Sequence, residues 1–295
     1  MFLRITSYSL ILQICILVSC FFSYTEATQA ICLKPDNQHA TQSPINIESL
    51  KVISASTTPP IILHNALFGF LNFTNTGKTL IAYTNQFLDP SSITGGVLCN
   101  DIPRLYKIHS IILHINQNPN GRSAHSVDGK GLPIELWVIY YKTSYGSLEN
   151  ALKFPNSIVV LALPVGVRKM PSARFIPFQL FLSTGILNKP SSSSELLGLI
   201  GYMWFDYLSK GHEHKLYNYV GSYLDPETGK LTQSAKVILC DPEQAPMISY
   251  DQFAVFKNIL GSDGKPINFT LPIYPQKSRP VYKSIGLHLE SIPIV

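Results

Sequence analysis

The sequence predicts a mainly β domain of the α+β class that spans about residues 31–295 as a single unit. Apolar residues make up 45% and charged residues only 14% of the chain, which excludes a disordered protein and a coiled coil. Short runs rich in Ile, Val, Tyr and Phe recur along the chain, and 21 Pro and 18 Gly favour short elements joined by turns. No internal repeat or change of composition indicates a second domain.

Strands are predicted wherever such a run is bounded by turn residues such as Gly95-Gly96 and Asp128-Gly129. The predicted strands are 61–63, 68–73, 79–83, 107–115, 134–141, 157–163 and 236–239. A helix is predicted to open near Glu195, after the Ser191–Ser194 tract. Its apolar positions recur at near-helical spacing, at Leu196, Leu197, Leu199, Ile200 and Met203.

The first thirty residues have the form of a secretory signal peptide. Arg4 precedes an apolar run from about residue 10 to residue 22, and the small residues Ala27 and Ala30 fit a cleavage site. The run is shorter than the roughly 20 apolar residues that cross a bilayer, so we predict no transmembrane span. We therefore expect a secreted, extracellular protein.

Two further features suit a secreted chain. Asn72 and Asn268 each begin a glycosylation sequon. Removal of the signal peptide leaves Cys32, Cys99 and Cys240, an odd number that implies one bridge and a spare thiol, or an intermolecular pair. The formal charge of +5 is spread along the chain rather than clustered, so we expect no nucleic-acid partner.

Several motifs in collinear order, from about residue 42 to residue 282, resemble the α-class carbonic anhydrases. They are Gln42-Ser43-Pro44-Ile45-Asn46-Ile47, Asn75-Thr76-Gly77-Lys78, Ala124-His125-Ser126-Val127-Asp128, Glu135-Leu136-Trp137-Val138-Ile139, Tyr219-Val220-Gly221-Ser222, and Pro275-Gln276 with Arg279. The resemblance implies a central twisted, mostly antiparallel sheet of about ten strands with a few peripheral helices. It also implies a conical pit in which three histidines hold zinc, two from one strand and one from its neighbour.

The resemblance places the three zinc positions at Ile112, His114 and Trp137, of which only His114 carries an imidazole. Catalytic zinc takes about three protein ligands and an activated water, and an apolar side chain cannot coordinate a metal. Alternate residues of a strand face the same way, so we expect His114 to share its face with Ile108, Ser110 and Ile112. His109 would then face the opposite way.

The other functional positions implied by the resemblance have also changed. Lys78 stands at the position of the proton-shuttle histidine, Ala124 at that of the orienting carboxylate, and Leu224 at that of the gatekeeper threonine. Glu135 is kept, and we interpret it as structural because no zinc histidine remains for it to orient. We therefore predict no catalytic residue, metal or cofactor, and expect Ile112 and Trp137 to stabilise the pit floor by apolar burial.

The resulting hypothesis is a non-catalytic, carbonic anhydrase-related protein that binds an extracellular glycan or protein. Scattered basic residues are compatible with an anionic glycan, namely Lys78, Arg104, Lys107, Arg122 and Lys130. The alternative is a zinc-dependent carbonic anhydrase with a divergent or residual site. A structural component of a secretion or matrix is a third hypothesis.

Three more sites receive an interpretation alongside this resemblance. His212-Glu213-His214 is expected to be an exposed loop rather than a metal pair. His125 is expected to match a buried structural histidine of the family. Secreted relatives often carry half of a disulfide near Cys32, which could pair with Cys240 or, equally, with Cys99.

Overall fold

The computed structural model describes residues 33, 42–55, 57–64, 70–84, 91–98, 105–197 and 214–290. Its strands are β1 (Ile45–Ile47), β2 (Ile53–Ser54), β3 (Ile61–His64), β4 (Phe70–Asn75), β5 (Leu80–Thr84), β6 (Ser92–Gly95), β7 (Tyr106–Ile115), β8 (Ser126–Val127), β9 (Ile134–Lys142), β10 (Ile158–Arg168), β11 (Ser193–Leu197), β12 (Lys215–Leu224), β13 (Leu231–Cys240), β14 (Met247–Ser249), β15 (Tyr274–Pro275), β16 (Tyr282–Ile285) and β17 (Leu287–Glu290). The α-helices are α2 (Leu148–Ala151), α3 (Ile176–Ser183) and α5 (Tyr250–Ala254). Single 3₁₀ turns are Ser49–Lys51, Gly96–Leu98, Thr143–Tyr145, Ala173–Phe175, Pro242–Gln244 and Val255–Asn258.

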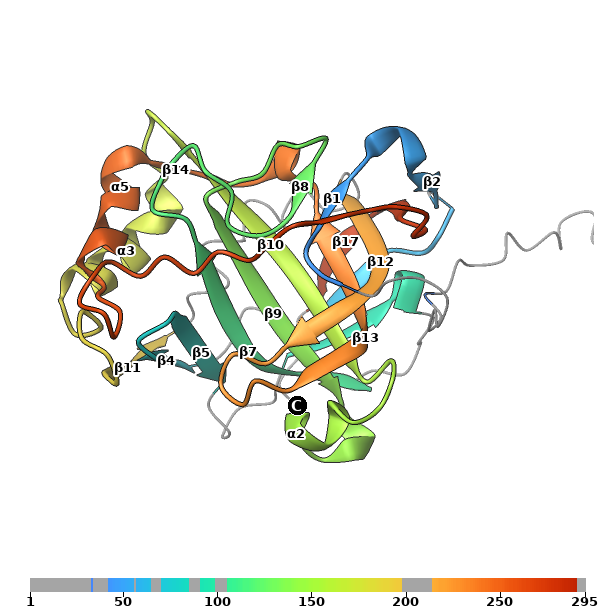
Figure 1. Ribbon diagram of the computed structural model, residues 1–295, viewed down its shortest axis with the longest axis horizontal. Helices are drawn as coiled ribbons and strands as arrows, with labels where there is room; N and C mark the ends of the chain where they lie inside the picture. Colours follow the sequence, from blue (N-terminus) through green and yellow to red (C-terminus); the bar gives the residue numbers. More distant parts are fainter. Residues whose placement is uncertain are drawn as a thin grey trace, which may run out of the picture.

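A large twisted sheet dominates the described part of the chain (Figure 1). Its continuous path runs β11-β4-β5-β7-β9-β10-β13-β12-β16-β2, and β3, β6, β14 and β17 branch from it to make 14 strands. Most neighbours are antiparallel, whereas β10 pairs in parallel with β13 and β16 with β2. A small second sheet joins β15, β1 and β8. The mainly β prediction and its mostly antiparallel sheet are confirmed.

The seven predicted strands all correspond to observed strands, and their ends differ by a few residues. The helix predicted to open near Glu195 is wrong over the described residues, because Ser193–Leu197 forms β11, antiparallel to β4. The backbone groups of β4 accept and donate the hydrogen bonds of that pairing, which overrides a helical pattern of leucines. Leu199, Ile200 and Met203 lie outside the described residues, as do the predicted signal peptide and residues 68 and 69.

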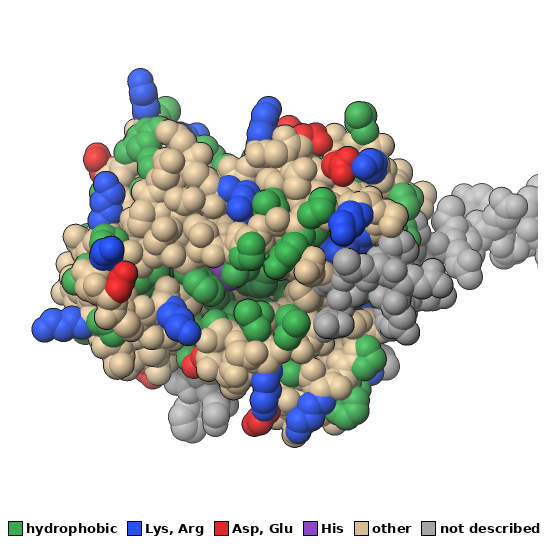
Figure 2. Space-filling model, viewed as in Figure 1, with side chains coloured by type: hydrophobic (Ala, Val, Ile, Leu, Met, Phe, Trp, Pro, Cys, Tyr) green, Lys and Arg blue, Asp and Glu red, His purple; other side chains and the backbone are tan. Residues whose placement is uncertain are grey.

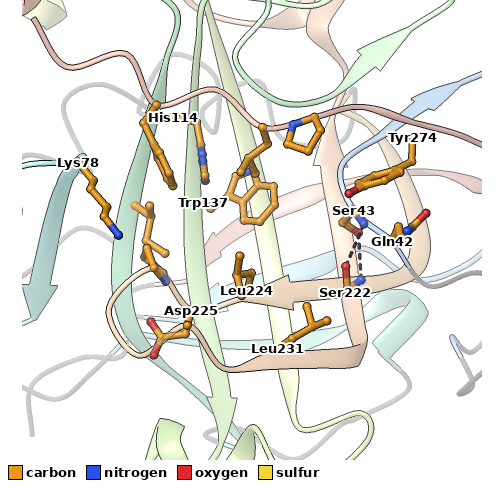
Figure 3. A pocket seen from close by; sticks show the side chains of 16 residues that line it. Gln42, Ser43, Lys78, His114, Trp137, Ser222, Leu224, Asp225, Leu231 and Tyr274 are labelled. Carbon is orange, nitrogen blue, oxygen red and sulfur yellow. Dashed lines mark hydrogen bonds between the residues drawn. The ribbon is translucent and has the colours of Figure 1, made fainter.

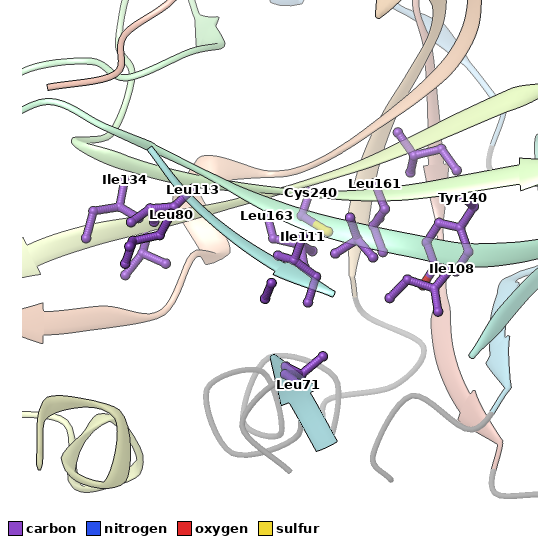
Figure 4. Close-up of a cluster of buried hydrophobic side chains, with 14 of the residues drawn as sticks. Leu71, Leu80, Ile108, Ile111, Leu113, Ile134, Tyr140, Leu161, Leu163 and Cys240 are labelled. Carbon is purple, nitrogen blue, oxygen red and sulfur yellow. The ribbon is translucent and has the colours of Figure 1, made fainter. Parts of the chain in front are cut away.

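The two faces of the sheet bury separate apolar clusters. One cluster packs under α3 and α5 and includes Phe178, Phe253 and the sheet residues in Figure 4. The other lies between the sheet and the elements β1 and α2, and includes Ile45 and Ile112. Because strand residues alternate between faces, the side on which a residue of β7 or β9 lies decides which cluster it joins.

A β-bulge in β7 shifts the alternation between Ile108 and Ser110. Ile108 therefore joins Ile111 and Leu113 in the cluster under the helices, as Figure 4 shows, while Ile112 lies on the other face. The expectation that Ile108 faces the pit is wrong for this reason. Strict alternation holds only in a regular strand, and the extra residue at the bulge reverses the facing of the residues before it.

Within the residues that the structure describes, no helix has the length and hydropathy that crossing a bilayer requires.

Gly95 and Gly96 form the predicted turn at the end of β6, with φ of +78° and +53°. A Cβ on Gly95 would lie 2.6 Å from the carbonyl oxygen of Pro60, whereas Gly129, at a φ of +77°, has open space. We predict that Gly95→Ala destabilises the fold by about 2 kcal/mol more than Gly129→Ala, which shares only the backbone strain. Urea unfolding of both variants measures this, and equal losses would contradict it.

Candidate functional site

A pit with a volume of about 420 Å³ opens on the sheet face opposite α3 and α5. Figure 2 shows it as a hollow lined mostly by hydrophobic side chains, and Figure 3 shows its walls. Its lining residues come from the large sheet, from the segment before β1, from the turn between β4 and β5, from the β12–β13 hairpin, and from β15 and the segment before it. They are Gln42, Ser43, Lys78, Ile112, His114, Trp137, Ser222, Leu224, Asp225, Pro226, Gly229, Leu231, Phe269, Leu271, Pro272 and Tyr274.

The floor of the pit is an aromatic stack. Ile112 and Trp137 face each other across β7 and β9, and both are buried. The His114 ring lies 4.5 Å from the Trp137 ring and 4.8 Å from the Phe269 ring, between centroids, and is nearly parallel to Phe269. The structure thus places the three positions named by the resemblance together, and only one of them is a histidine.

Glu135 lies beneath this floor, 2% exposed, and accepts three hydrogen bonds. The backbone N–H of His125 donates to Oε2 at 3.0 Å, and His125 Nδ1 lies 2.5 Å from Oε1. The indole N–H of Trp137 donates to the same Oε1 at 2.7 Å. The carboxylate therefore retains a structural partner at position 137, although that partner is an indole rather than an imidazole.

The network continues toward the N-terminal motif. The Tyr219 hydroxyl lies 2.7 Å from Nε2 of His125 and 3.0 Å from Oγ of Ser43. Ser43 and Ser222 exchange two further bonds, because each backbone N–H donates to the other's hydroxyl oxygen. The predicted burial of His125 is confirmed, and this network encloses its side chain.

Burial and hydrogen bonding set the protonation of the two central groups. Burial alone would raise the pKa of Glu135. The nearby charge of His125 and the hydrogen bonds that His125 and Trp137 donate hold this pKa below its usual value. Burial lowers the pKa of His114 to about 3, against a smaller opposing effect of Glu135. His114 is therefore neutral at pH 7, and neither of its ring nitrogens has a hydrogen-bond partner among the described residues.

The remaining predicted positions lie around the pit. Lys78 lies in the β4–β5 turn and points toward the opening (Figure 3). Leu224 ends β12, is 52% exposed and lines the pit, so this position offers no hydroxyl. Ala124 is buried beside the network and does not line the cavity. Asp225, which the sequence did not single out, is 6% exposed and accepts from the Glu227 N–H and the Thr228 hydroxyl.

Two predictions about histidines are wrong. His109 was expected to face away from His114, but the bulge turns its ring toward Tyr83 and Tyr141, with centroids 5.8 and 6.1 Å away, on the pit side of the sheet. His214, predicted to lie in an exposed loop, is fully buried immediately before β12. His212 and Glu213 lie outside the described residues.

The basic residues named from the sequence do not act as one group. Arg122 donates to the carbonyl oxygens of Ala124 and Leu271, and the Lys107 ammonium lies 5.2 Å from the centre of the Tyr141 ring. Lys130 is exposed in the turn after β8. Arg104 lies outside the described residues. Two of the five basic residues, Arg122 and Lys107, are thus engaged in contacts within the protein.

The structure describes both sequon asparagines and one of the three predicted mature cysteines. Asn72 on β4 and Asn268 are both exposed. Cys240 is buried in the cluster under the helices. Cys32 and Cys99 lie outside the described residues, so the pairing of Cys32 with Cys240 or Cys99 stays a prediction.

The donor atoms of the floor do not fit zinc. Ile112 has no donor atom, and the indole nitrogen of Trp137 is a hydrogen-bond donor only. Within the described ranges, no group of three or more His, Cys, Asp or Glu side chains is placed to hold a metal ion. Phe269, which the motif analysis did not assign to the pit, closes one side of His114, and no sequence signal connects it to that residue.

Removing the Trp137 side chain tests the floor as a stabilising element. We predict that Trp137→Ala lowers the free energy of unfolding by about 3–5 kcal/mol, because a cavity forms and Glu135 loses a donor. Trp137→Phe keeps one aromatic ring but removes the N–H and part of the indole volume, so a smaller loss of about 2 kcal/mol is expected. Urea unfolding checks both values, and an unchanged melting curve for Trp137→Ala would refute the idea.

The buried His114 predicts a pH dependence of stability. Its pKa is about 3 when folded and about 6.5 when unfolded, so the unfolded chain binds more protons between those values. Stability from neutral His114 is complete above pH 6.5 and decreases as pH falls, by up to about 1.4 kcal/mol per pH unit. His114→Leu should flatten the slope between pH 6.5 and 4.5. Parallel pH profiles for the variant and wild type would contradict this.

Comparison with known proteins agrees with the fold and the motifs. A family model described as eukaryotic-type carbonic anhydrase matches residues 30–285. Human carbonic anhydrase 7 is 28% identical over 132 residues, 44% of this chain and 48% of its own length. Rat carbonic anhydrase 4 is 30% identical over 159 residues, 52% of this chain and 47% of its own length.

The chain thus spans about half the length of these two relatives. Mouse carbonic anhydrase 4 aligns more widely, at 25% identity over 277 residues, 90% of this chain and 84% of the relative. The family model covers well over half of the chain and confirms the resemblance found in the motifs. This protein belongs to the eukaryotic-type carbonic anhydrase family.

Proposed function

We propose that this chain is a secreted, non-catalytic member of the carbonic anhydrase family that acts by binding an extracellular glycan or protein. The observation that carries the proposal is the floor of the pit. Ile112 and Trp137 occupy two of the three positions at which the family resemblance places zinc ligands, and they pack against each other. His114 alone supplies a nitrogen of the right kind.

One imidazole is too few ligands for a catalytic zinc site, which takes about three protein ligands and keeps one position for water. The hydroxide that such a zinc would generate also needs positioning, and Leu224 and Ala124 carry neither a hydroxyl nor a carboxylate. The buried network around Glu135 supports the proposal, because it is complete with Trp137 as a donor and needs no metal.

Secretion is supported by the signal-type N-terminus and by two exposed sequons, Asn72 and Asn268. The open pit supports a binding role. Leu224 and Leu231 line it, and their side chains are 52% and 53% exposed. Contiguous exposed apolar surface of this kind marks interaction sites. Mouse carbonic anhydrase 4, by its name an enzyme, is the reference for the alternative of a zinc-dependent activity.

The test begins with the full-length chain expressed in a secretory cell line and purified from the medium. We expect to find the protein in the medium. Its zinc content, measured by elemental mass spectrometry, should be well below one ion per chain, and CO₂ hydration should proceed at the uncatalysed rate. Retention of the protein in the cells would refute secretion. One zinc per chain with measurable hydration would overturn the non-catalytic assignment and favour the enzyme.

Restoring the ligands provides the matched control. The double variant Ile112→His with Trp137→His places three imidazoles on neighbouring positions of β7 and β9, and Glu135 can accept from the new ring as it does from the indole. We expect this variant to bind about one zinc per chain, and the single variant Ile112→His to bind far less. Equal zinc in all three proteins would show that these positions do not decide metal binding.

A further inference from the structure

We propose that the pit is a binding site for a small apolar carboxylate, with an aliphatic or aromatic tail in the pit and the carboxylate beside Lys78. The inference rests on the proposed function, because a zinc ion at the floor would itself bind anions. It goes beyond that function by adding a small-molecule ligand, distinct from the proposed glycan or protein partner, and the residues that select it.

The shape and lining of the pit favour an apolar tail. A volume of about 420 Å³ lies within the range of sites for small molecules. Trp137 and Phe269 form the inner wall, and Leu224 and Leu231, paired across the β12–β13 hairpin, form the outer wall. About half of each leucine is exposed, so a bound tail would remove this apolar surface from water.

Four polar side chains of the lining already make hydrogen bonds within the protein. Ser43 and Ser222 bond to each other, and the Trp137 N–H is used by Glu135. The Asp225 carboxylate accepts from its own turn, through the Glu227 N–H and the Thr228 hydroxyl. The inner and outer walls of the pit therefore offer a ligand mainly apolar contact.

Lys78 is the charged group that remains available. Its side chain extends from the β4–β5 turn toward the opening of the pit, as Figure 3 shows. Within the described part of the chain, the ion pairs involve Lys51, Lys230 and Lys283 but not Lys78. Asp225 is the one acidic residue of the described lining, and its oxygens accept bonds from the turn. An ammonium at the mouth of an apolar cavity matches an amphiphilic acid.

Calorimetric titration of the purified full-length secreted protein with octanoate and with octylamine tests the charge preference without any variant. The two probes share a tail and carry opposite charges at pH 7. We expect octanoate to bind at least tenfold more tightly. Lys78→Gln should weaken octanoate about fivefold, as loss of one solvent-exposed ion pair implies, and the matched variant Lys130→Gln, outside the pit, should leave it unchanged.

Zinc is measured in the same sample, so that failure of this inference can be told apart from failure of the proposed function. Absence of octanoate binding in zinc-free protein would refute this inference and leave the proposed function standing. Octylamine binding as tightly as octanoate would also refute it, because Asp225 would then select the ligand. One zinc per chain would refute the proposed function itself, and the inference with it. A fivefold loss in Lys130→Gln would show that binding lies outside the pit.

Discussion

The burial of one carboxylate constrains the rest of this structure. Glu135 is almost inaccessible to water, and a buried charge is costly unless hydrogen bonds replace its hydration. The backbone and ring of His125 and the indole of Trp137 provide those bonds. His125 in turn holds Tyr219, and Tyr219 reaches the N-terminal motif at Ser43, so segments more than 170 residues apart depend on a single charge.

This constraint explains which apolar residue closes the floor of the pit. A leucine or phenylalanine at position 137 would fill space but leave Oε1 of Glu135 with one donor fewer. Tryptophan combines a large apolar surface with an N–H, and that N–H meets the carboxylate at 2.7 Å. Ile112 needs no polar partner because it faces the indole across the sheet. Ile112 and Trp137 are thereby part of a packed core, on a chain that belongs to the carbonic anhydrase family.

An apolar floor also changes what the pit can do. The cavity offers shape, exposed apolar walls and a cation at its mouth. Burial beside Trp137 and Phe269 likewise keeps His114 neutral, so that it acts as an aromatic wall. Trp137 and Phe269 pack around His114 and also line the cavity, so the stability of the floor and the shape of the cavity depend on the same apolar surfaces.

The sequence by itself determined the mainly β class, the seven strands, the family and the loss of imidazoles at two positions, because local composition and short motifs carry that information. Only the tertiary structure decided which face each residue occupies. The bulge in β7 turned Ile108 away from the pit and His109 toward it, and strand pairing with β4 made Glu195 part of a strand. Phe269 and Asp225 joined the site through folding alone, since contacts between distant segments leave no periodic signal in the chain.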